Sequence, residues 1–238
     1  MASVDPKKFL YPIVSLGADG QAEYLRGNAF PVTTDGSLLM CRHVTSAAEG
    51  TTLAVLDLET GQSAAITNVV YPRDPSLDVA FLPGVLGRET HRLPLLPPEN
   101  VLVDQDVYTP GFYSPSSRIE TVADGYFKGN IVRVQTVRGY STATLSYPII
   151  EGLSGSPVLQ YYNGVKLIGM CFGSESQRVL AAEVVEVDDG EMKYRETVNR
   201  IVEFGLAYRS ETLETFLAST NSPPPVVTAE RFLDDELA

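Results

Sequence analysis

The sequence predicts an all-β fold of two β-units, each of about six strands, followed by one short C-terminal helix. Runs rich in Val, Ile, Tyr, Thr and Leu recur about every 8 to 12 residues between turn residues, which is typical of all-β proteins. Helical periodicity is nearly absent before residue 200. A Pro-rich run near the middle of the chain separates the strands into two groups.

The predicted strands span residues 11–16, 27–33, 37–41, 52–58, 64–71, 79–82, 106–112, 129–137, 156–161, 165–173 and 179–187. Four of the separating segments end in glycine, which supplies the positive φ that a tight turn requires. These hairpin turns are predicted at residues 34–36, 59–61, 162–164 and 188–190.

The Pro-rich run at residues 93–98 is interpreted as an extended connector between the two β-units. We therefore divide the chain into an N-terminal β-unit (residues 1–92), a C-terminal β-unit (93–220) and a Pro-rich acidic tail (221–238). The tail is either mobile or docked onto the β-units, and it offers a place for contact with a partner.

The closing helix is predicted over residues 209–219. Its apolar residues Leu213, Phe216 and Leu217 follow the i, i+3, i+4 spacing of one helix face. Ser210 is the candidate N-cap, because a serine hydroxyl accepts from a free backbone NH of the first turn.

The charge balance argues against two classes of partner. Lys+Arg 18 and Asp+Glu 30 give a net charge of −12, which repels nucleic acid and anionic membrane surfaces alike. No apolar run reaches the roughly 18 residues that span a bilayer. Asp5 and Pro12 also interrupt what would otherwise resemble a signal peptide. We therefore expect a cytoplasmic protein that binds neither nucleic acid nor membranes.

The two cysteines, Cys41 and Cys171, lie in apolar surroundings. We expect buried free thiols rather than a disulfide. The chain has neither a CxxC spacing nor more than two histidines, so we expect no metal site.

A candidate nucleophile lies in the run Gly152-Leu153-Ser154-Gly155-Ser156-Pro157. A nucleophilic serine needs a sharp turn that exposes its hydroxyl, and the flanking glycines permit one. The NH groups of Gly152 and Ser154 would then form an oxyanion hole. A plain hairpin of small residues is the alternative interpretation.

The base for such a serine is one of two histidines, His43 or His91. His43 directly follows an apolar strand, where its ring can face a cleft, whereas His91 lies in a polar stretch and is expected at the surface. A purely structural role for His43 stays open.

The acid that orients the histidine is expected to be Asp78, which lies among apolar residues at the start of a strand and is therefore expected to be buried. Weaker candidates are Asp74 and Asp57, the latter in a hairpin that is expected to be exposed, and Asp78 can also be a strand-capping residue.

The order His43, Asp78, Ser154 is that of chymotrypsin. The sequence resembles trypsin-like serine peptidases of the chymotrypsin double-β-barrel fold, and especially short bacterial domains of the HtrA type without a PDZ domain. The similar segments lie within about residues 10–218, namely residues 27–30 (GNAF), 35–44 (DGSLLMCRHV), 77–82 (LDVAFL), 152–157 (GLSGSP) and 204–207 (FGLA). Three departures are Ala29, Cys41-Arg42 and Ser156, and none of them removes a catalytic atom.

The resemblance implies a serine endopeptidase with the triad His43, Asp78 and Ser154 and without a cofactor. It places Pro148 and Ile149 at the base of the specificity pocket and pairs residues Phe172, Gly173 and Ser174 with the substrate. These residues offer no charge to a substrate, so we expect cleavage of proteins or peptides after small or medium apolar residues. The alternative is an inactive scaffold that binds a partner protein.

Overall fold

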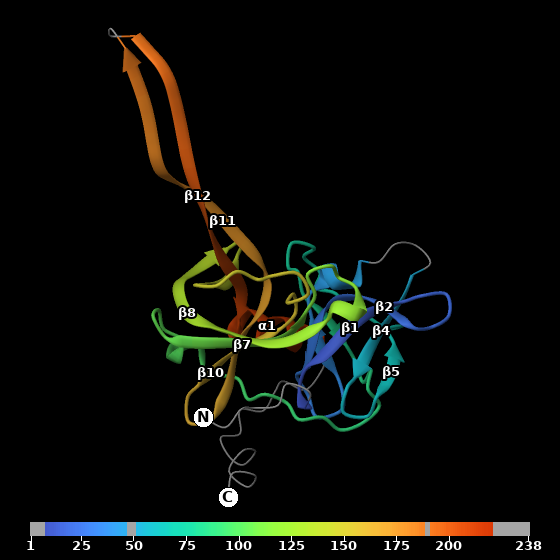
Figure 1. The fold of residues 1–238 in the computed structure, drawn as a ribbon. Helices are drawn as coiled ribbons and strands as arrows, with labels where there is room; N and C mark the ends of the chain where they lie inside the picture. The colour runs from blue at the N-terminus through green and yellow to red at the C-terminus, as the bar shows by residue number, and fades with distance from the viewer. Residues whose placement is uncertain (1–7, 47–50, 189–190, 221–238) are drawn as a thin grey trace, which may run out of the picture.

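The computed structural model describes residues 8–46, 51–188 and 191–220, which form two antiparallel β-sheets side by side (Figure 1). The first sheet has the order β5-β4-β1-β2-β3-β6. Its strands are β1 (Tyr11–Leu16), β2 (Ala22–Pro31), β3 (Leu38–Met40), β4 (Thr52–Asp57), β5 (Gln62–Ala65) and β6 (Ala80–Leu82).

The second sheet closes into a barrel in the order β10-β11-β12-β9-β8-β7. Its strands are β7 (Asp106–Tyr113), β8 (Ala123–Val137), β9 (Tyr140–Leu145), β10 (Pro157–Tyr161), β11 (Val165–Asp188) and β12 (Glu191–Arg209). One helix, α1 (Ser210–Ser219), follows β12. The predicted all-β class, with two six-stranded units and a short C-terminal helix, is confirmed.

Strand pairing departs from the prediction mainly in the second sheet. The two strands expected at residues 165–173 and 179–187 form the single strand β11, because the residues between them, 174–178, pair with residues 201–205 of β12. Strand β9 and the outer part of β12 are not among the predicted strands. The strand expected at residues 64–71 ends early at Ala65.

The connection between β6 and β7 includes the 3-10 helix η3 (Pro98–Asn100) and docks on the barrel. Leu96 NH donates to Leu167 O over 2.9 Å, and Leu167 NH donates to Pro94 O over 2.8 Å. The boundary expected after residue 92 falls inside this connection, and the division itself stays a prediction.

The prediction that Ser210 caps α1 is wrong, because α1 begins at Ser210 and the N-cap is Arg209. The Ser210 hydroxyl donates to Leu96 O over 3.2 Å, so it ties the helix to the connection instead of capping it. Leu213, Phe216 and Leu217 are buried, as the spacing predicts. No helix within the described ranges is long and apolar enough to cross a membrane. The tail at residues 221–238, including its expected contact with a partner, lies outside the described residues.

Two apolar clusters fill the fold. The larger one lies on the inner face of the first sheet and continues onto α1, whereas the smaller one occupies the barrel around Ile131, Leu145 and Ile168. Burying each such side chain contributes about 1.5–3 kcal/mol. Apolar packing of this kind is non-directional, so other contacts must fix how the two sheets meet.

The fully buried side chain of Asn28 provides these directional contacts. Asn28 lies on β2, and its Nδ2 donates to Phe112 O on β7 over 2.9 Å and to Gly152 O over 2.7 Å. Its Oδ1 accepts from Phe112 NH over 3.1 Å, and its backbone NH donates to Ser154 O over 2.8 Å. One residue of the first sheet thus holds both a barrel strand and the loop that carries Ser154.

We predict that Asn28→Ala lowers the free energy of unfolding by about 3 kcal/mol, because it leaves buried donors and acceptors without partners. Urea denaturation measures the change. Asn130→Ala is the control, because Asn130 Nδ2 also donates to two oxygens, over 3.0 and 3.3 Å, at a more exposed place. Its cost is expected below about 1 kcal/mol. Equal losses in the two variants would contradict the role assigned to Asn28.

Candidate active site

His43 lies where β3 leaves the first sheet. After Cys41 the chain turns into the 3-10 helix η2 (Arg42–Thr45), which is anchored by the buried side chain of Val44. The His43 side chain stays 48% exposed. The sequence therefore places the ring beside the core but open to solvent.

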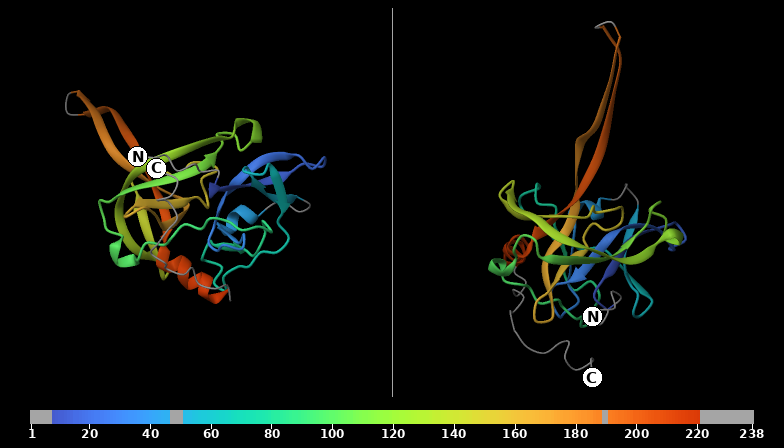
Figure 2. Two further views of the ribbon diagram at one scale, coloured as in Figure 1. Left: turned by 90° about the horizontal axis from the view of Figure 1, so that it is seen from below. Right: turned by 60° about the vertical axis from the view of Figure 1, so that its left-hand side comes forward.

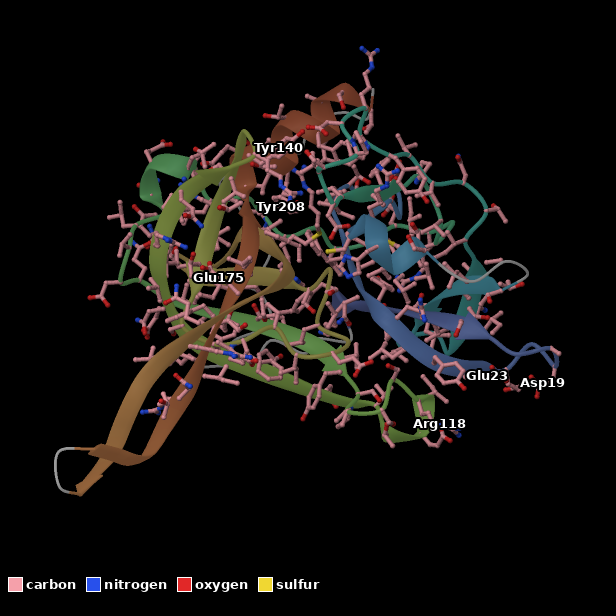
Figure 3. All side chains as sticks on the ribbon, turned by 90° about the horizontal axis from the view of Figure 1, so that it is seen from above. Asp19, Glu23, Arg118, Tyr140, Glu175 and Tyr208 are labelled. Carbon is pink, nitrogen blue, oxygen red and sulfur yellow. The ribbon has the colours of Figure 1, made fainter. Side chains whose placement is uncertain are left out.

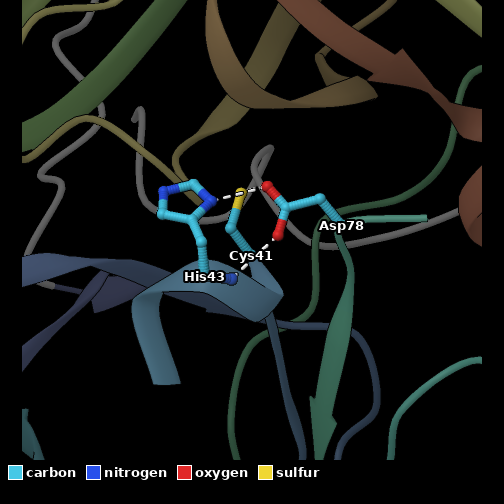
Figure 4. Close-up of side chains that lie close together, drawn as sticks. All are labelled: Cys41, His43 and Asp78. Carbon is cyan, nitrogen blue, oxygen red and sulfur yellow. Dashed lines mark hydrogen bonds and ion pairs between the residues drawn. The ribbon is translucent and has the colours of Figure 1, made fainter. Parts of the chain in front are cut away.

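Asp78 holds His43 through both carboxylate oxygens (Figure 4). Oδ1 accepts from the His43 backbone NH over 2.8 Å, and Oδ2 lies 2.5 Å from Nδ1. An ionised carboxylate only accepts, so Nδ1 carries the proton and Nε2 is left as an acceptor. The Asp78 side chain is 26% exposed and lies two positions before β6 begins at Ala80, so it is less buried than expected and does not itself open the strand.

Tyr208 on β12 supports Asp78 from the other sheet. The Asp78 NH donates to the Tyr208 hydroxyl over 3.1 Å, and burial raises the pKa of Tyr208 to about 12, so the hydroxyl stays neutral. Phe172 stacks on Tyr208 with ring centroids 4.1 Å apart. Tyr140 meets Tyr208 edge to face on the same side of the barrel (Figure 3). The sequence contains no local signal for this support, because the contact joins residues 130 positions apart.

Ser154 lies in a loop built from two glycines with positive φ. Leu153 NH donates to Ile150 O over 3.0 Å and closes a turn in which Gly152 has φ +93°. Gly155, with φ +83°, makes the second bend. Only glycine adopts such angles readily, so the two glycines place Ser154 on the sharp bend that the motif predicts, where it is half-buried.

The peptide between Glu151 and Gly152 is fixed in orientation. Ser114 NH donates to Glu151 O over 3.3 Å. Since the C=O and N–H of a trans peptide point in opposite directions, the Gly152 NH points away from Ser114. Among the described residues, neither the Gly152 NH nor the Ser154 NH donates a hydrogen bond. Two free NH groups in one turn are what an oxyanion requires.

Gly27 brings the loop that carries Ser154 against η2. A Cβ at Gly27 would lie 2.6 Å from Val44 Cγ2 and 2.7 Å from Ser154 O. Gly27 on β2 therefore lies against both Val44, which follows His43 in the sequence, and Ser154. A Cβ at Gly155 would overlap the carbonyl of Asn28. Within the described part of the chain the Ser154 hydroxyl makes no hydrogen bond to the His43 ring. Such contacts often tighten only when substrate is bound.

The weaker candidates for the acid and the base, and the second serine of the motif, lie elsewhere or make other contacts. Asp57 is buried and pairs with Arg88 over 2.8 Å, contrary to the exposed position expected for it. Asp74 is exposed and accepts from the Tyr140 hydroxyl over 2.5 Å. His91 is exposed. Ser156 is fully buried, and its hydroxyl has no partner among the described residues.

Cys41 and Cys171 are both buried and free, as predicted. Cys41 Sγ, His43 and Asp78 bring ligand atoms within 4.8 Å of one another, which is a distance that a metal ion could bridge (Figure 4). However, burial raises the pKa of Cys41 well above its usual value, and its thiol donates to Cys171 O over 3.1 Å. A metal would need the thiolate, so these atoms fit a hydrogen-bond network better than a metal site.

Two of the predicted pocket residues, Ile149 and Ser174, lie in direct contact. The Ser174 hydroxyl accepts from Ile149 NH over 2.7 Å and donates to Ile149 O over 3.1 Å. Ile149 also packs on Gly205 of β12, where a Cβ would lie 2.9 Å from Ile149 Cδ1. A Cβ at Gly173 would meet open space. Pro148 is half-buried, and Glu151 is exposed and accepts a hydrogen bond from the Ser117 hydroxyl.

A family model for the trypsin-like peptidase domain matches residues 27–170. That range contains His43, Asp78 and Ser154. No curated protein matches the sequence.

Solved structures resemble the fold. One is Rv3671c from M. tuberculosis H37Rv, a serine-to-alanine mutant in its inactive form, with 19% identity and a TM-score of 0.56; the alignment covers 94% of this chain and 98% of that one. Another is the HtrA-type protease AlgW with a tripeptide, with 16% identity and a TM-score of 0.57 over 90% of this chain. The chain spans 61% of the AlgW chain. At these identities the likeness concerns the fold.

We predict that Gly152→Ala strongly slows the reaction of Ser154 with a fluorophosphonate probe. The added Cβ would lie 2.8 Å from Leu25 Cδ2 and 2.9 Å from Tyr113 Cα, which forces the turn to move. Gly164→Ala is the matched control, because Gly164 has φ +100° and open space around it. It carries the same backbone cost without the clash, so its labelling rate is expected to match that of the unaltered protein. Equal labelling of the two variants would contradict the role of this turn.

Proposed function

Because the chain belongs to the trypsin-like peptidase domain family, we propose that it is a serine endopeptidase with the triad His43, Asp78 and Ser154. The observation that carries the proposal is the pair of hydrogen bonds that His43 makes to Asp78, through its backbone NH and through Nδ1, which leaves Nε2 of the ring available as a base. A capping role for Asp78 accounts for its hydrogen bond to the His43 backbone NH but not for its hydrogen bond to the His43 ring.

In the proposed acylation step the Ser154 hydroxyl attacks the carbonyl carbon of the scissile peptide bond. His43 Nε2 takes the hydroxyl proton, and Asp78 stabilises the imidazolium that forms. The tetrahedral intermediate then collapses, the C–N bond breaks, and His43 gives its proton to the leaving amine. The acyl group stays on Ser154 as an ester.

Deacylation reverses these roles with water as the nucleophile. His43 takes a proton from the water, which attacks the ester, and returns it to the Ser154 oxygen as the acid product leaves. In both steps the negative charge develops on the former carbonyl oxygen. The NH groups of Gly152 and Ser154 stabilise it, and a single donor of this kind is worth roughly 10²–10³ in rate. The proposed steps use no metal or organic cofactor.

We infer a specificity for small or medium apolar residues before the scissile bond. The residues proposed for the pocket are Pro148 and Ile149 on one side and Gly173 and Ser174 on the other, and none carries a charge. The hydrogen bonds from Ser174 to Ile149 tie the two sides together and narrow the space between them. A basic side chain would gain no ion pair there.

Two finer expectations stay proposals. A cytoplasmic location is supported by the two free thiols, since reducing compartments keep cysteines unpaired.

An inactive scaffold that binds a partner is the alternative to a peptidase, and reaction with a fluorophosphonate separates the two, because only an activated serine is labelled.

We predict that Ser154→Ala abolishes both fluorophosphonate labelling and turnover. Ser156→Ala is the matched control, because this second serine of the motif is buried, and its change removes only a hydroxyl without a partner. The control is expected to label normally, as intact-mass spectrometry would show. An active Ser154→Ala variant together with an inactive Ser156→Ala variant would move the nucleophile to the other serine.

We predict that Ser174→Gly shifts specificity toward larger apolar residues, because it removes the hydroxyl that bridges to Ile149. The ratio of kcat/KM for Phe over Ala before the scissile bond is expected to rise about tenfold, since pocket contacts of this size are worth about 1–3 kcal/mol. A peptide library measures the ratio. Ser63→Gly, an exposed change on β5 of the first sheet, is expected to leave it unchanged. Strong cleavage after Lys or Arg in any variant would contradict the proposed pocket.

A further inference from the structure

Strands β11 and β12 continue far beyond the barrel as a two-stranded arm (Figures 1 and 2). We define the arm as residues 175–188 and 191–204. Its pairs run from Glu175↔Phe204 to Asp188↔Glu191. At about 3.4 Å per residue, 14 residues span roughly 45 Å.

Both edges of the arm are open within the described residues. Strand β11 pairs with β10 only as far as Met170, and β12 pairs with β9 only as far as Gly205. Beyond these points each strand pairs with the other alone. An open strand edge presents a row of unpaired NH and C=O groups, which is a template for another extended chain.

The base of the arm is exposed but anchored. Ser176, Arg178 and Val179 are exposed, whereas Glu175 forms an ion pair with Arg133 on β8 over 3.3 Å. Figure 3 shows Glu175 where the arm leaves the barrel. A two-stranded ribbon is only marginally stable in water, so a third strand on its edge would stabilise it.

The open edge of β11 begins at the residues proposed to bind substrate. From Phe172 onward this edge continues the side of β11 that faces β10 and the nucleophile loop. A substrate strand antiparallel to β11 runs from the tip of the arm toward Ser154. Its residues before the scissile bond therefore lie along the arm, in order.

We propose that the arm extends the substrate-binding edge, so that the protein acts on extended polypeptide segments rather than on short peptides. The proposal rests on the proposed peptidase function. The register of β11 against β12 is uninterrupted from Gly173 to Leu180 and shifts between Leu180 and Ala182. A bulge of this kind bends a strand, so residues 173–180 are the segment that pairs with substrate.

The charge of the arm restricts which polypeptides are expected to bind along it. The sequence from residue 174 to 204 contains eight acidic and four basic residues, and the whole chain has a net charge of −12. Two such arms would repel each other, which disfavours a second copy as the occupant. The expected partner is a neutral or basic chain without stable structure.

The test uses peptides that carry 3, 6 or 10 residues before the same cleavage site, with extensions of Thr and Gln to hold the charge constant. Binding is measured by fluorescence anisotropy on the Ser154→Ala variant, and kcat/KM is measured on the active protein. We expect about tenfold tighter binding and higher kcat/KM from the shortest to the longest peptide, equivalent to about 1.4 kcal/mol.

Two truncations locate the contact. In the shorter arm Asn-Gly replaces residues 177–202 and joins Ser176 to Glu203, a paired position that a two-residue turn can close. This variant should lose most of the gain with length and still bind the 3-residue peptide normally. The matched control replaces residues 181–198 with Asn-Gly between Leu180 and Asn199, which keeps the proposed segment, so its length dependence should be unchanged.

Each outcome decides the proposal. The proposal is overturned if the variant that lacks residues 177–202 still binds longer peptides more tightly. It is also overturned if the variant that lacks residues 181–198 loses this length dependence to the same extent, because the contact would then lie at the tip of the arm. A dimer that dissociates on truncation, seen by light scattering, would assign the edge to a second copy. N-methylation of the extension amides should abolish the gain in binding, because it removes the NH donors of a strand. Absence of fluorophosphonate labelling would refute the peptidase while the binding assay still tests the arm.

Discussion

The amide of Asn28 is the contact on which the geometry of the active site depends. His43 and Asp78 belong to the first sheet, whereas Ser154 belongs to a loop of the barrel, and apolar packing between two sheets allows them to slide. Asn28 removes this freedom, because its four hydrogen bonds to Phe112, Gly152 and Ser154 are directional and lie where no water can replace them. The close approach of Gly27 to the same loop then sets the distance between the serine and the histidine.

A second link between the sheets connects the proposed substrate edge to Asp78, the proposed acid. Phe172, at the start of that edge, stacks on Tyr208, whose hydroxyl accepts from the Asp78 NH. Phe172 and Tyr208 lie on β11 and β12, which are neighbouring strands of the barrel. Two aromatic rings and one hydrogen bond therefore separate the proposed substrate edge from Asp78.

Local patterns in the sequence predict what depends on local chemistry. The sharp bend at Ser154 needs glycine on both sides, and the turn into His43 follows an apolar strand, so both were accessible from neighbouring residues alone. The contacts of Asn28 and Tyr208 join residues 84 to 130 positions apart and leave no such pattern. Residues 174–178 are not among the predicted strands for the same reason, because only their pairing with residues 201–205 across the sheet makes them strand.

The arm also bears on how the second barrel reaches its native register. Asp188 and Glu191 pair only three positions apart in the sequence, so the first contacts between its strands close a small loop and cost little chain entropy. A hairpin of this kind forms within about 1–10 μs. Once it zips inward from Asp188↔Glu191, the pairing of β11 with β12 inside the barrel is already determined, down to Gly169↔Arg209. The arm thus lets the pairing of β11 with β12 in the barrel, which joins residues as far apart as Gly169 and Arg209, follow from contacts between near neighbours in the sequence.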